Sequence, residues 1–218
     1  NRIALWNGTS WDTLSSGMNA EVLALLIDSA SNMLYAAGDF NTAGGVVANK
    51  IARWDGSNWA PLGSGMDYNI NALAIYNGVL YAGGDFDVAG GTAAYHVAKW
   101  DGAAWSAVGS GSNLMVNALE VYDGKLYAAG KFTSMGGVPA KRIASWNDSV
   151  WTTVGTGMNN QVFALTVFND KLYAGGAFLT AGGDTMKYIA AWDGVSWSEV
   201  DSGMDSTVFS LAADEDAM

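Results

Sequence analysis

The sequence predicts an all-β protein, a β-propeller built from four-stranded blades. The phrase LYAAGDF at residue 34 returns as LYAGGDF at 80, LYAAGKF at 126 and LYAGGAF at 172, which is a period of 46 residues. The ten tryptophans form pairs five residues apart, and none is left over: Trp6/Trp11, Trp54/Trp59, Trp100/Trp105, Trp146/Trp151 and Trp192/Trp197. No stretch has helical spacing, and short strands with a tryptophan and glycine signature at this period are typical of propeller blades.

One period contains four strand-like phrases. INALAIY (70–76) and VLYAGGDF (79–86) flank Asn77-Gly78, a pair that suits the positive φ angles of a type I′ turn. HVAKW (96–100) and WSAVGSG (105–111) are joined by DGAA, and the Gly/Ala-rich segment 85–95 links the two hairpins. Small residues in the second phrase allow neighbouring backbones to approach closely. We therefore expect the tryptophans to lie mainly in the core between blades.

The repeats predict one domain over 1–218. Four repeats span 22–66, 70–112, 116–158 and 162–204, and a shared blade combines 1–18 with 208–218. The first strand occurs five times, around Val22, Ile70, Val116, Val162 and Val208, but the second strand occurs only four times. We predict five blades, with the last blade shared between the termini and lacking one strand. The same count fits a piece of a longer repeat protein, and an unfilled strand position would leave strand edges unpaired.

Composition and charge exclude several classes of function. Half of the residues are hydrophobic and 14% are charged, which supplies a sizeable core. The net charge of −11 makes this an acidic protein and disfavours nucleic acid as a partner. The longest apolar run, VLALLI, is far shorter than the roughly 18 residues of a membrane helix, so no membrane insertion is expected. With no cysteine, the chain has no thiolate nucleophile and no zinc–thiolate site.

Few residues could carry catalysis. His96 is the single histidine, and it occupies a repeat position that is otherwise filled by Arg2, Lys50, Arg142 and Tyr188. We expect it to be a solvated residue at the start of a strand. No GxSxG motif accompanies it. The sequence therefore predicts no catalytic residues, so the chain is not expected to be an enzyme; a hydrolase or lyase is the least favoured alternative.

Two columns of Asp and Asn recur along the repeats. One follows the first tryptophan of each pair and the other follows SGM or its equivalent: Asn7, Asp55, Asp101, Asn147 and Asp193, then Asn19, Asp67, Asn113, Asn159 and Asp205. Rings of oxygen ligands are one hypothesis for calcium. Side chains of this type at turns usually accept hydrogen bonds from the backbone two residues on, and we favour that interpretation for both columns. No cofactor and no metal site is predicted.

The motif order resembles the kelch class of propeller repeat. The closer resemblance is to a kelch-like repeat, LYxGGxFxxAGGxxANxIAxWDGxxWxxLGSGM, of secreted or surface bacterial proteins and a fungal cortical polarity-marker family. It is matched over Leu34 to Met66, Leu80 to Ser112, Leu126 to Met158 and Leu172 to Met204. The resemblance implies a secreted or cell-surface propeller that acts as a lectin-like binding module, while fold alone does not fix function.

Variation within the repeat identifies the candidate site. The connections from the fourth to the first strand and from the second to the third strand should share one face, where residues change although the scaffold repeats. The candidate ligand-binding residues are Tyr68, Asn69, Leu114, Met115, Asp85, Lys131, Asn160 and Gln161. We expect a glycan or protein ligand there. The alternative is that these residues lie on a solvated face and vary without any adaptation to a ligand. A second hypothesis is an assembly module completed by a strand from a neighbouring chain or domain, including a homo-oligomer.

Overall fold

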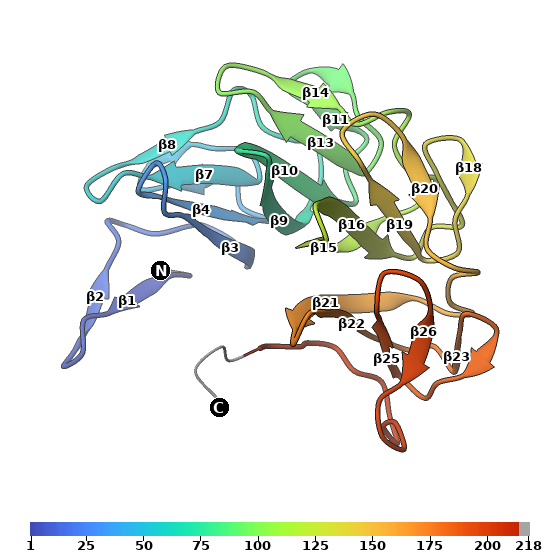
Figure 1. Ribbon diagram of the computed structural model, residues 1–218. Helices are drawn as coiled ribbons and strands as arrows, with labels where there is room; N and C mark the ends of the chain where they lie inside the picture. Colours follow the sequence, from blue (N-terminus) through green and yellow to red (C-terminus); the bar gives the residue numbers. More distant parts are fainter. Residues whose placement is uncertain (214–218) are drawn as a thin grey trace. The chain divides into compact units, whose positions relative to one another are not determined.

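The computed structural model describes residues 1–213, and every regular element in that range is a β-strand (Figure 1). The chain divides into two compact units, unit 1 (Asn1–Ala107) and unit 2 (Val108–Met218), which are described separately below. Within 1–213 no helix is long and apolar enough to cross a membrane. The last five residues of the predicted shared blade, 214–218, lie outside the described residues.

Unit 1 contains two four-stranded antiparallel sheets. Blade A has the order β3-β4-β7-β8, and blade B has the order β9-β10-β13-β14. Their strands are β3 (Val22–Asp28), β4 (Met33–Gly38), β7 (Ile51–Trp54) and β8 (Trp59–Pro61), then β9 (Ile70–Tyr76), β10 (Val79–Gly84), β13 (Val97–Trp100) and β14 (Trp105–Ala107). The unit begins with a separate hairpin of β1 (Ala4–Trp6) and β2 (Trp11–Thr13).

Unit 2 repeats this architecture. Blade C has the order β15-β16-β19-β20, and blade D has the order β21-β22-β25-β26. Their strands are β15 (Val116–Tyr122), β16 (Lys125–Gly130), β19 (Ile143–Trp146) and β20 (Trp151–Thr153), then β21 (Val162–Phe168), β22 (Lys171–Gly176), β25 (Ile189–Trp192) and β26 (Trp197–Glu199). The prediction of repeated four-stranded sheets is therefore confirmed.

The link between the second and third strands contains a small ladder that the sequence did not predict. In each blade this Gly/Ala-rich segment folds back on itself as a two-stranded sheet. The ladders pair β5 (Thr42–Ala43) with β6 (Val46–Val47), β11 (Val88–Ala89) with β12 (Thr92–Ala93), β17 (Ser134–Met135) with β18 (Val138–Pro139), and β23 (Thr180–Ala181) with β24 (Asp184–Thr185). We call each of these segments the ladder connection.

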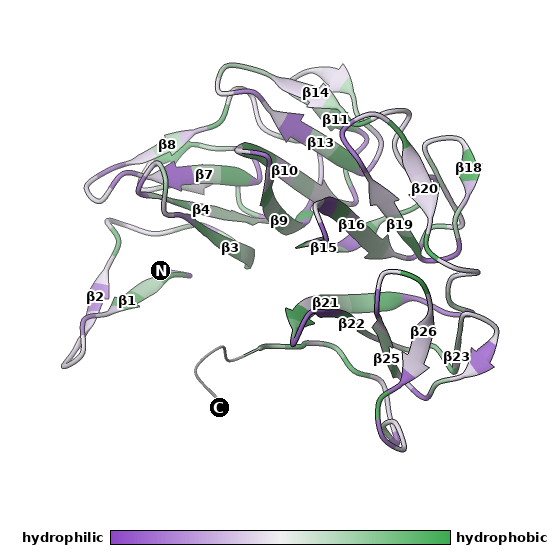
Figure 2. Ribbon diagram, viewed as in Figure 1, coloured by the Kyte–Doolittle hydropathy of each residue, from purple (hydrophilic) through white to green (hydrophobic). Residues whose placement is uncertain are grey.

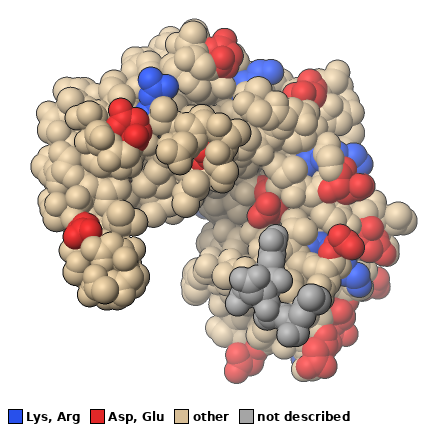
Figure 3. Space-filling model, turned by 60° about the vertical axis from the view of Figure 1, so that its left-hand side comes forward, with Lys and Arg blue, Asp and Glu red and all other residues tan. Residues whose placement is uncertain are grey.

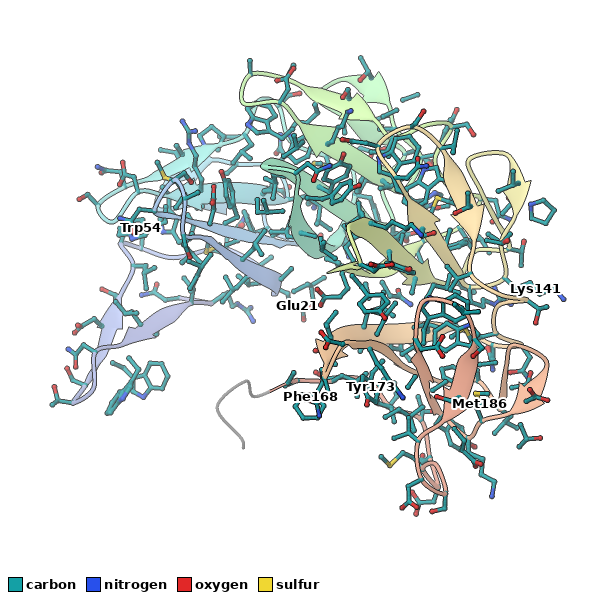
Figure 4. The ribbon with its side chains drawn as sticks, viewed as in Figure 1. Glu21, Trp54, Lys141, Phe168, Tyr173 and Met186 are labelled. Atoms are coloured by element: carbon teal, nitrogen blue, oxygen red, sulfur yellow. The ribbon has the colours of Figure 1, made fainter. Side chains whose placement is uncertain are left out.

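The hairpin turns follow the residue chemistry. Asn77 and Gly78 have φ angles of 51° and 74°, and Tyr76 pairs with Val79, as a type I′ turn requires. An aromatic pair lies at this end of three of the inner hairpins. In blade D, the rings of Phe168 and Tyr173 have centroids 6.4 Å apart (Figure 4). Local turn preference thus sets the register that places these rings together.

The core of each unit lies between its blades. In unit 1, β9 packs across β3 and β4, so that Leu73 and Leu80 join Tyr35 and Ala37 in one cluster. In unit 2, β21 packs across β15 and β16 in the same way. Blade B therefore buries the inner strands of blade A, and blade D buries those of blade C, which is the packing expected of adjacent propeller blades.

The second tryptophan of a pair links neighbouring elements by a hydrogen bond. The indole N–H of Trp59 donates to the carbonyl of Leu14 at 3.1 Å, and that of Trp105 donates to the carbonyl of Leu62 at 2.9 Å. Trp151 and Trp197 do the same in unit 2. All four of these rings are at least nine-tenths buried, which confirms the core prediction for them.

The prediction that tryptophans are mainly core residues is wrong for the first pair. Trp6 is 50% exposed and Trp11 is 69% exposed, whereas Trp59 is 5% exposed. The physical reason is that, among residues 1–213, β1 and β2 pair only with each other, so no inner strands like those of blades A to D cover this hairpin.

Candidate functional site

The two variable connections lie together in every blade, as the sequence predicted. The backbone N–H of Asp85 donates to the carbonyl of Asn69 at 2.9 Å, and that of Lys131 donates to the carbonyl of Met115 at 3.0 Å. The same bond joins Asp39 to Glu21 and Ala177 to Gln161. We call the end of each blade formed by these connections the loop end.

The structure places the eight candidate residues at the loop ends. In unit 1, Asn69 and Asp85 are partly buried neighbours, and Tyr68 is 55% exposed. In unit 2, Leu114 is 41% exposed and Lys131 is exposed; the others are Met115, Asn160 and Gln161, of which only Asn160 is exposed. Tyr68 and Leu114 thus present apolar surface at a loop end.

Polar contacts beneath three of the four loop ends were missed in the sequence. The ammonium group of Lys50 lies 2.8 Å from the carboxylate of Asp39, and Nε2 of His96 lies 4.0 Å from the carboxylate of Asp85. In blade C, Arg142 instead donates to the backbone carbonyl of Lys131. The sequence signal for these contacts was a constant spacing of eleven residues between the loop-end position (Asp39, Asp85, Lys131) and the strand-start position (Lys50, His96, Arg142).

The prediction of a solvated His96 is wrong. Its side chain is 12% exposed, and that of Lys50 is 11% exposed. Both residues have a φ angle of 68°, in the left-handed region that bulky residues rarely adopt. Each side chain contacts the variable residue of its own loop end, Asp39 for Lys50 and Asp85 for His96.

The two Asp and Asn columns have different roles. In the first column, Oδ1 of Asp55 accepts hydrogen bonds from the N–H groups of Ser57 and Asn58 at 2.8 and 2.7 Å, which confirms the turn interpretation. These backbone donors hold the pKa of Asp55 below its ordinary value. The pKa values of Asp101 and Asp193 are lowered for the same reason.

The turn interpretation is wrong for the second column. Oδ1 of Asp67 accepts hydrogen bonds from the backbone N–H groups of Asp87 and Val88, which are 20 and 21 residues further on. Asn19, Asn113 and Asn159 hold their own ladder connections in the same way. This column therefore ties the ladder connection to the link that precedes the blade. Long-range bonds of this kind leave no local sequence signal.

Two buried polar groups add to the chemistry. The side-chain oxygen of Asn69 is buried, and no hydrogen bond reaches it within residues 1–213. On β15, burial raises the pKa of Glu120, and one backbone N–H, that of Val121, partly offsets the effect. Across the described part of the chain, no group of three or more His, Asp or Glu residues is placed to hold a metal ion. On the face shown in Figure 3, acidic side chains are spread out with a few basic side chains among them.

Unit 1 also has an exposed apolar region away from the loop ends. Alternate residues of β3, namely Leu23, Leu25 and Ile27, are 46%, 55% and 73% exposed. Figure 2 shows the hydrophobic colour of this strand. A pocket of about 260 Å³ lies between blade A and the first hairpin; it is lined by Leu5, Leu14, Ile27, Asn32, Met33, Leu34, Trp54 and Gly56. We call β1, β2 and this face of β3 the open edge.

In unit 2, residues after blade D occupy a first-strand position without forming a strand. The N–H of Val208 donates to the carbonyl of Gly176 at 3.1 Å, and the rings of Phe209 and Phe163 have centroids 5.1 Å apart. A Cβ on Gly175 would meet the side chains of Val208 and Leu211, so this segment packs across β22. The sequence predicted a first strand here. It has no strand assignment, because no second strand pairs with it in the described chain.

Comparison with known proteins supports the fold. Residues 123–144 match a family model described as a β-propeller domain of unknown function. A solved structure, that of the computationally designed Ika8 protein, is similar over 92% of this chain with a TM-score of 0.60 and 19% sequence identity. This chain covers 55% of the length of that protein. No curated protein matches the chain. The matches show a β-propeller repeat architecture.

Proposed function

We propose that this chain is a non-catalytic binding module whose loop ends recognise a glycan or a protein at the cell surface or outside the cell. The observation that carries the proposal is the contrast between constant and variable positions in the repeats. The scaffold keeps its tryptophans and glycines, whereas the matching loop-end residues are Asp39, Asp85, Lys131 and Ala177. Residues that differ at exposed positions of a repeated scaffold are suited to a specific ligand.

The burial beneath the loop ends supports this interpretation. Lys50 and His96 lie against the variable carboxylates, so the orientation of Asp39 and Asp85 is restrained from below. Restrained polar groups beside exposed apolar residues such as Tyr68 combine hydrogen bonding with stacking surface. Such surfaces bind sugars and peptide segments without chemical turnover.

We further propose that the chain is a kelch-like propeller of five blades within one domain. Two observations support it, one in each unit. The hairpin β1–β2 has the sequence and pairing of the outer half of a blade, and residues 208–211 pack across blade D as a first strand would. A fifth blade shared between the termini accounts for both.

The loop-end proposal is tested by screening the folded chain on a glycan array and against candidate surface proteins. We expect a ligand whose binding is lost in Tyr68→Ala. The matched control is Val195→Ala, because Val195 is 84% exposed in the tight turn between β25 and β26. Binding that falls equally in both variants, or in neither, would contradict the assignment of the site.

A second candidate function is a structural module completed by a strand from another chain. The open edge favours it, because Leu25, Ile27 and Trp11 are each more than half exposed. Strand addition satisfies backbone groups at an unpaired edge and covers such surface. Light scattering over a range of concentrations tests it, and a strict monomer that binds no strand-like peptide would contradict it.

A further inference from the structure

We propose that the open edge of unit 1 is an acceptor site for one extended peptide segment, which adds to β1 as a strand. The segment has the chemistry of the repeat's own second strand, Leu-Tyr-Ala-(Ala or Gly)-Gly. The inference rests on the second candidate function and adds the site, the register and the side-chain pattern of the partner.

The first argument is the unpaired edge of β1. In blades A to D the third strand lies between a second and a fourth strand: β7, for example, pairs with β4 and β8. The strand β1 pairs with β2 alone within the described residues. Its outward N–H and C=O groups are therefore available to an incoming strand.

The register of the incoming strand follows from the other blades. In blade A, Leu34 of β4 lies opposite Trp54, Tyr35 opposite Arg53, and Ala36 opposite Ala52. Blades B, C and D keep this pairing of the LYA phrase with the strand that ends in tryptophan. The partner's leucine is therefore placed opposite Trp6, its tyrosine opposite Leu5 and its alanine opposite Ala4.

The second argument is the exposed face of β3. The residue in β9 that matches Leu25 is Leu73, which is 8% exposed and belongs to a core cluster that includes Tyr35 of the preceding blade, with Leu26 packed against the cluster. Leu25 is 55% exposed, and Ile27 is 73% exposed. The missing cover is therefore a strand that presents a tyrosine and small residues, the chemistry that covers Leu73.

Other occupants fit less well. A second copy of this chain has no spare second strand, because β4, β10, β16 and β22 are each paired on both sides. A helix would leave the edge of β1 without hydrogen-bond partners. The pocket beside the edge is lined by uncharged side chains, which favours an uncharged segment over a charged one.

Unit 2 has a position at its end where a ladder connection would be expected from the repeat and none is present in residues 1–213. Asp205 belongs to the column that binds ladder connections, yet within residues 1–213 it accepts no such hydrogen bond. Met204 is 46% exposed, whereas the matching Met66 is 3% exposed. A pocket of about 560 Å³ lies here, lined by residues that include Leu179, Lys187, Met204 and Asp205. Within residues 1–213, this part of unit 2 therefore has no ladder connection bound to Asp205.

The test is a titration of the full chain with a synthetic peptide of the sequence of residues 171–185, KLYAGGAFLTAGGDT. We expect one peptide to bind per chain, with a blue shift of tryptophan fluorescence as Trp6 and Trp11 become covered. Calorimetry should show that Ile27→Lys weakens binding by at least about tenfold, which is about 1.4 kcal/mol. The matched control, Val195→Lys at an equally exposed turn, should bind as the parent does.

Three outcomes would overturn the inference: no binding, equal binding of a scrambled peptide, or binding unchanged by Ile27→Lys. The chain could instead fail to bind the peptide but self-associate in a way that Ile27→Lys abolishes. This outcome would identify a second copy of the chain as the occupant. That result would leave the assembly function standing and refute only the inference. Ligand binding that depends on Tyr68 is a separate readout, so failure of the loop-end proposal is distinguishable from failure here.

Discussion

The hairpins β1–β2 and β7–β8 differ in burial although they share their sequence signature. Their tryptophan rings adopt nearly the same arrangement, with centroids 5.4 and 5.3 Å apart and interplanar angles of 54° and 46°. Trp11 is nevertheless 69% exposed, and the matching Trp59 is 5% exposed. The geometry of the pair is therefore a local property of the hairpin, and its burial depends on the strands around it.

This comparison explains the open edge. The hairpin β7–β8 has β4 on its inner side, whereas β1–β2 has no inner strand in the described chain. The same type of hairpin is thus part of the core at β7–β8 and presents exposed apolar surface at β1–β2. The proposed vacant strand position accounts for the exposed tryptophans, the exposed face of β3 and the unpaired edge of β1.

The largest expected effect comes from truncating matched tryptophans. Trp59→Ala removes a buried ring and its hydrogen bond to Leu14, so the free energy of unfolding should fall by about 3–5 kcal/mol. Trp11→Ala removes an exposed ring and should cost less than about 1 kcal/mol. Chemical denaturation followed by circular dichroism measures both. Similar costs would contradict the comparison.

A second prediction concerns the glycine that ends the second strand of a blade. A Cβ on Gly84, the last residue of β10, would clash with the carbonyl oxygen of Asn69. Gly84→Ala should therefore cost about 2–3 kcal/mol, because the backbone must move. Gly78→Ala is the matched control: it has open space but a φ angle of 74°, and should cost about 1 kcal/mol. An equal or smaller loss for Gly84→Ala would contradict the close-approach argument.

A smaller effect of opposite sign is expected at Glu120. Because burial raises its pKa, the folded state takes up its proton more readily than the unfolded state. The charged carboxylate of Glu120 lowers the free energy of unfolding. This loss is absent below the ordinary glutamate pKa of about 4.3 and develops as pH rises through the pKa of Glu120 in the folded state. Glu120→Thr, which copies Thr166 of blade D, should stabilise the protein by about 1 kcal/mol at neutral pH.

The gain from Glu120→Thr should disappear in acid. Glu21→Thr serves as the control, because Glu21 is an exposed residue of the loop end (Figure 4). Thermal melts of both variants at neutral and acidic pH provide the measurement. A gain that is independent of pH would show that packing, and not the buried carboxylate, is responsible.

The smallest expected effect is at the hairpin turns. Backbone N–H groups of Ala103 and Ala104 lower the pKa of Asp101, so its contribution to stability is present above its unfolded pKa and is lost as pH falls through the folded value. Asp101→Asn, which copies Asn7 and Asn147, should keep the turn and remove this pH dependence. Asp101→Ala should weaken the turn at every pH, and melts that do not distinguish the two variants would contradict the assignment.

The sequence predicted the elements that depend on local chemistry. The Asn77-Gly78 turn, the span of β9 and the two hairpins of blade B follow from turn preferences and the repeat period. The close approach at Gly84 was likewise indicated by its lack of a side chain. These features repeat because the same residue types pack in the same way within each blade.

The features that the sequence did not predict depend on contacts between segments distant in the chain. The neighbours of Asp67 predict a turn residue, but its carboxylate accepts hydrogen bonds from Asp87 and Val88. The position of His96 in the repeat predicts a solvated strand start, but its side chain is largely buried and contacts Asp85. The exposure of Trp11 depends on an absent neighbour, about which its own hairpin carries no information.

The most direct test of the account is amide hydrogen exchange of β1 with and without the peptide of residues 171–185. A strand that pairs with β1 should slow exchange in residues 4–6 by at least about tenfold at saturating peptide. Exchange in β7, which already has partners on both sides, should remain unchanged. Unchanged exchange in β1 at peptide saturation would contradict the claim that the first hairpin is a blade half that lacks its inner strand.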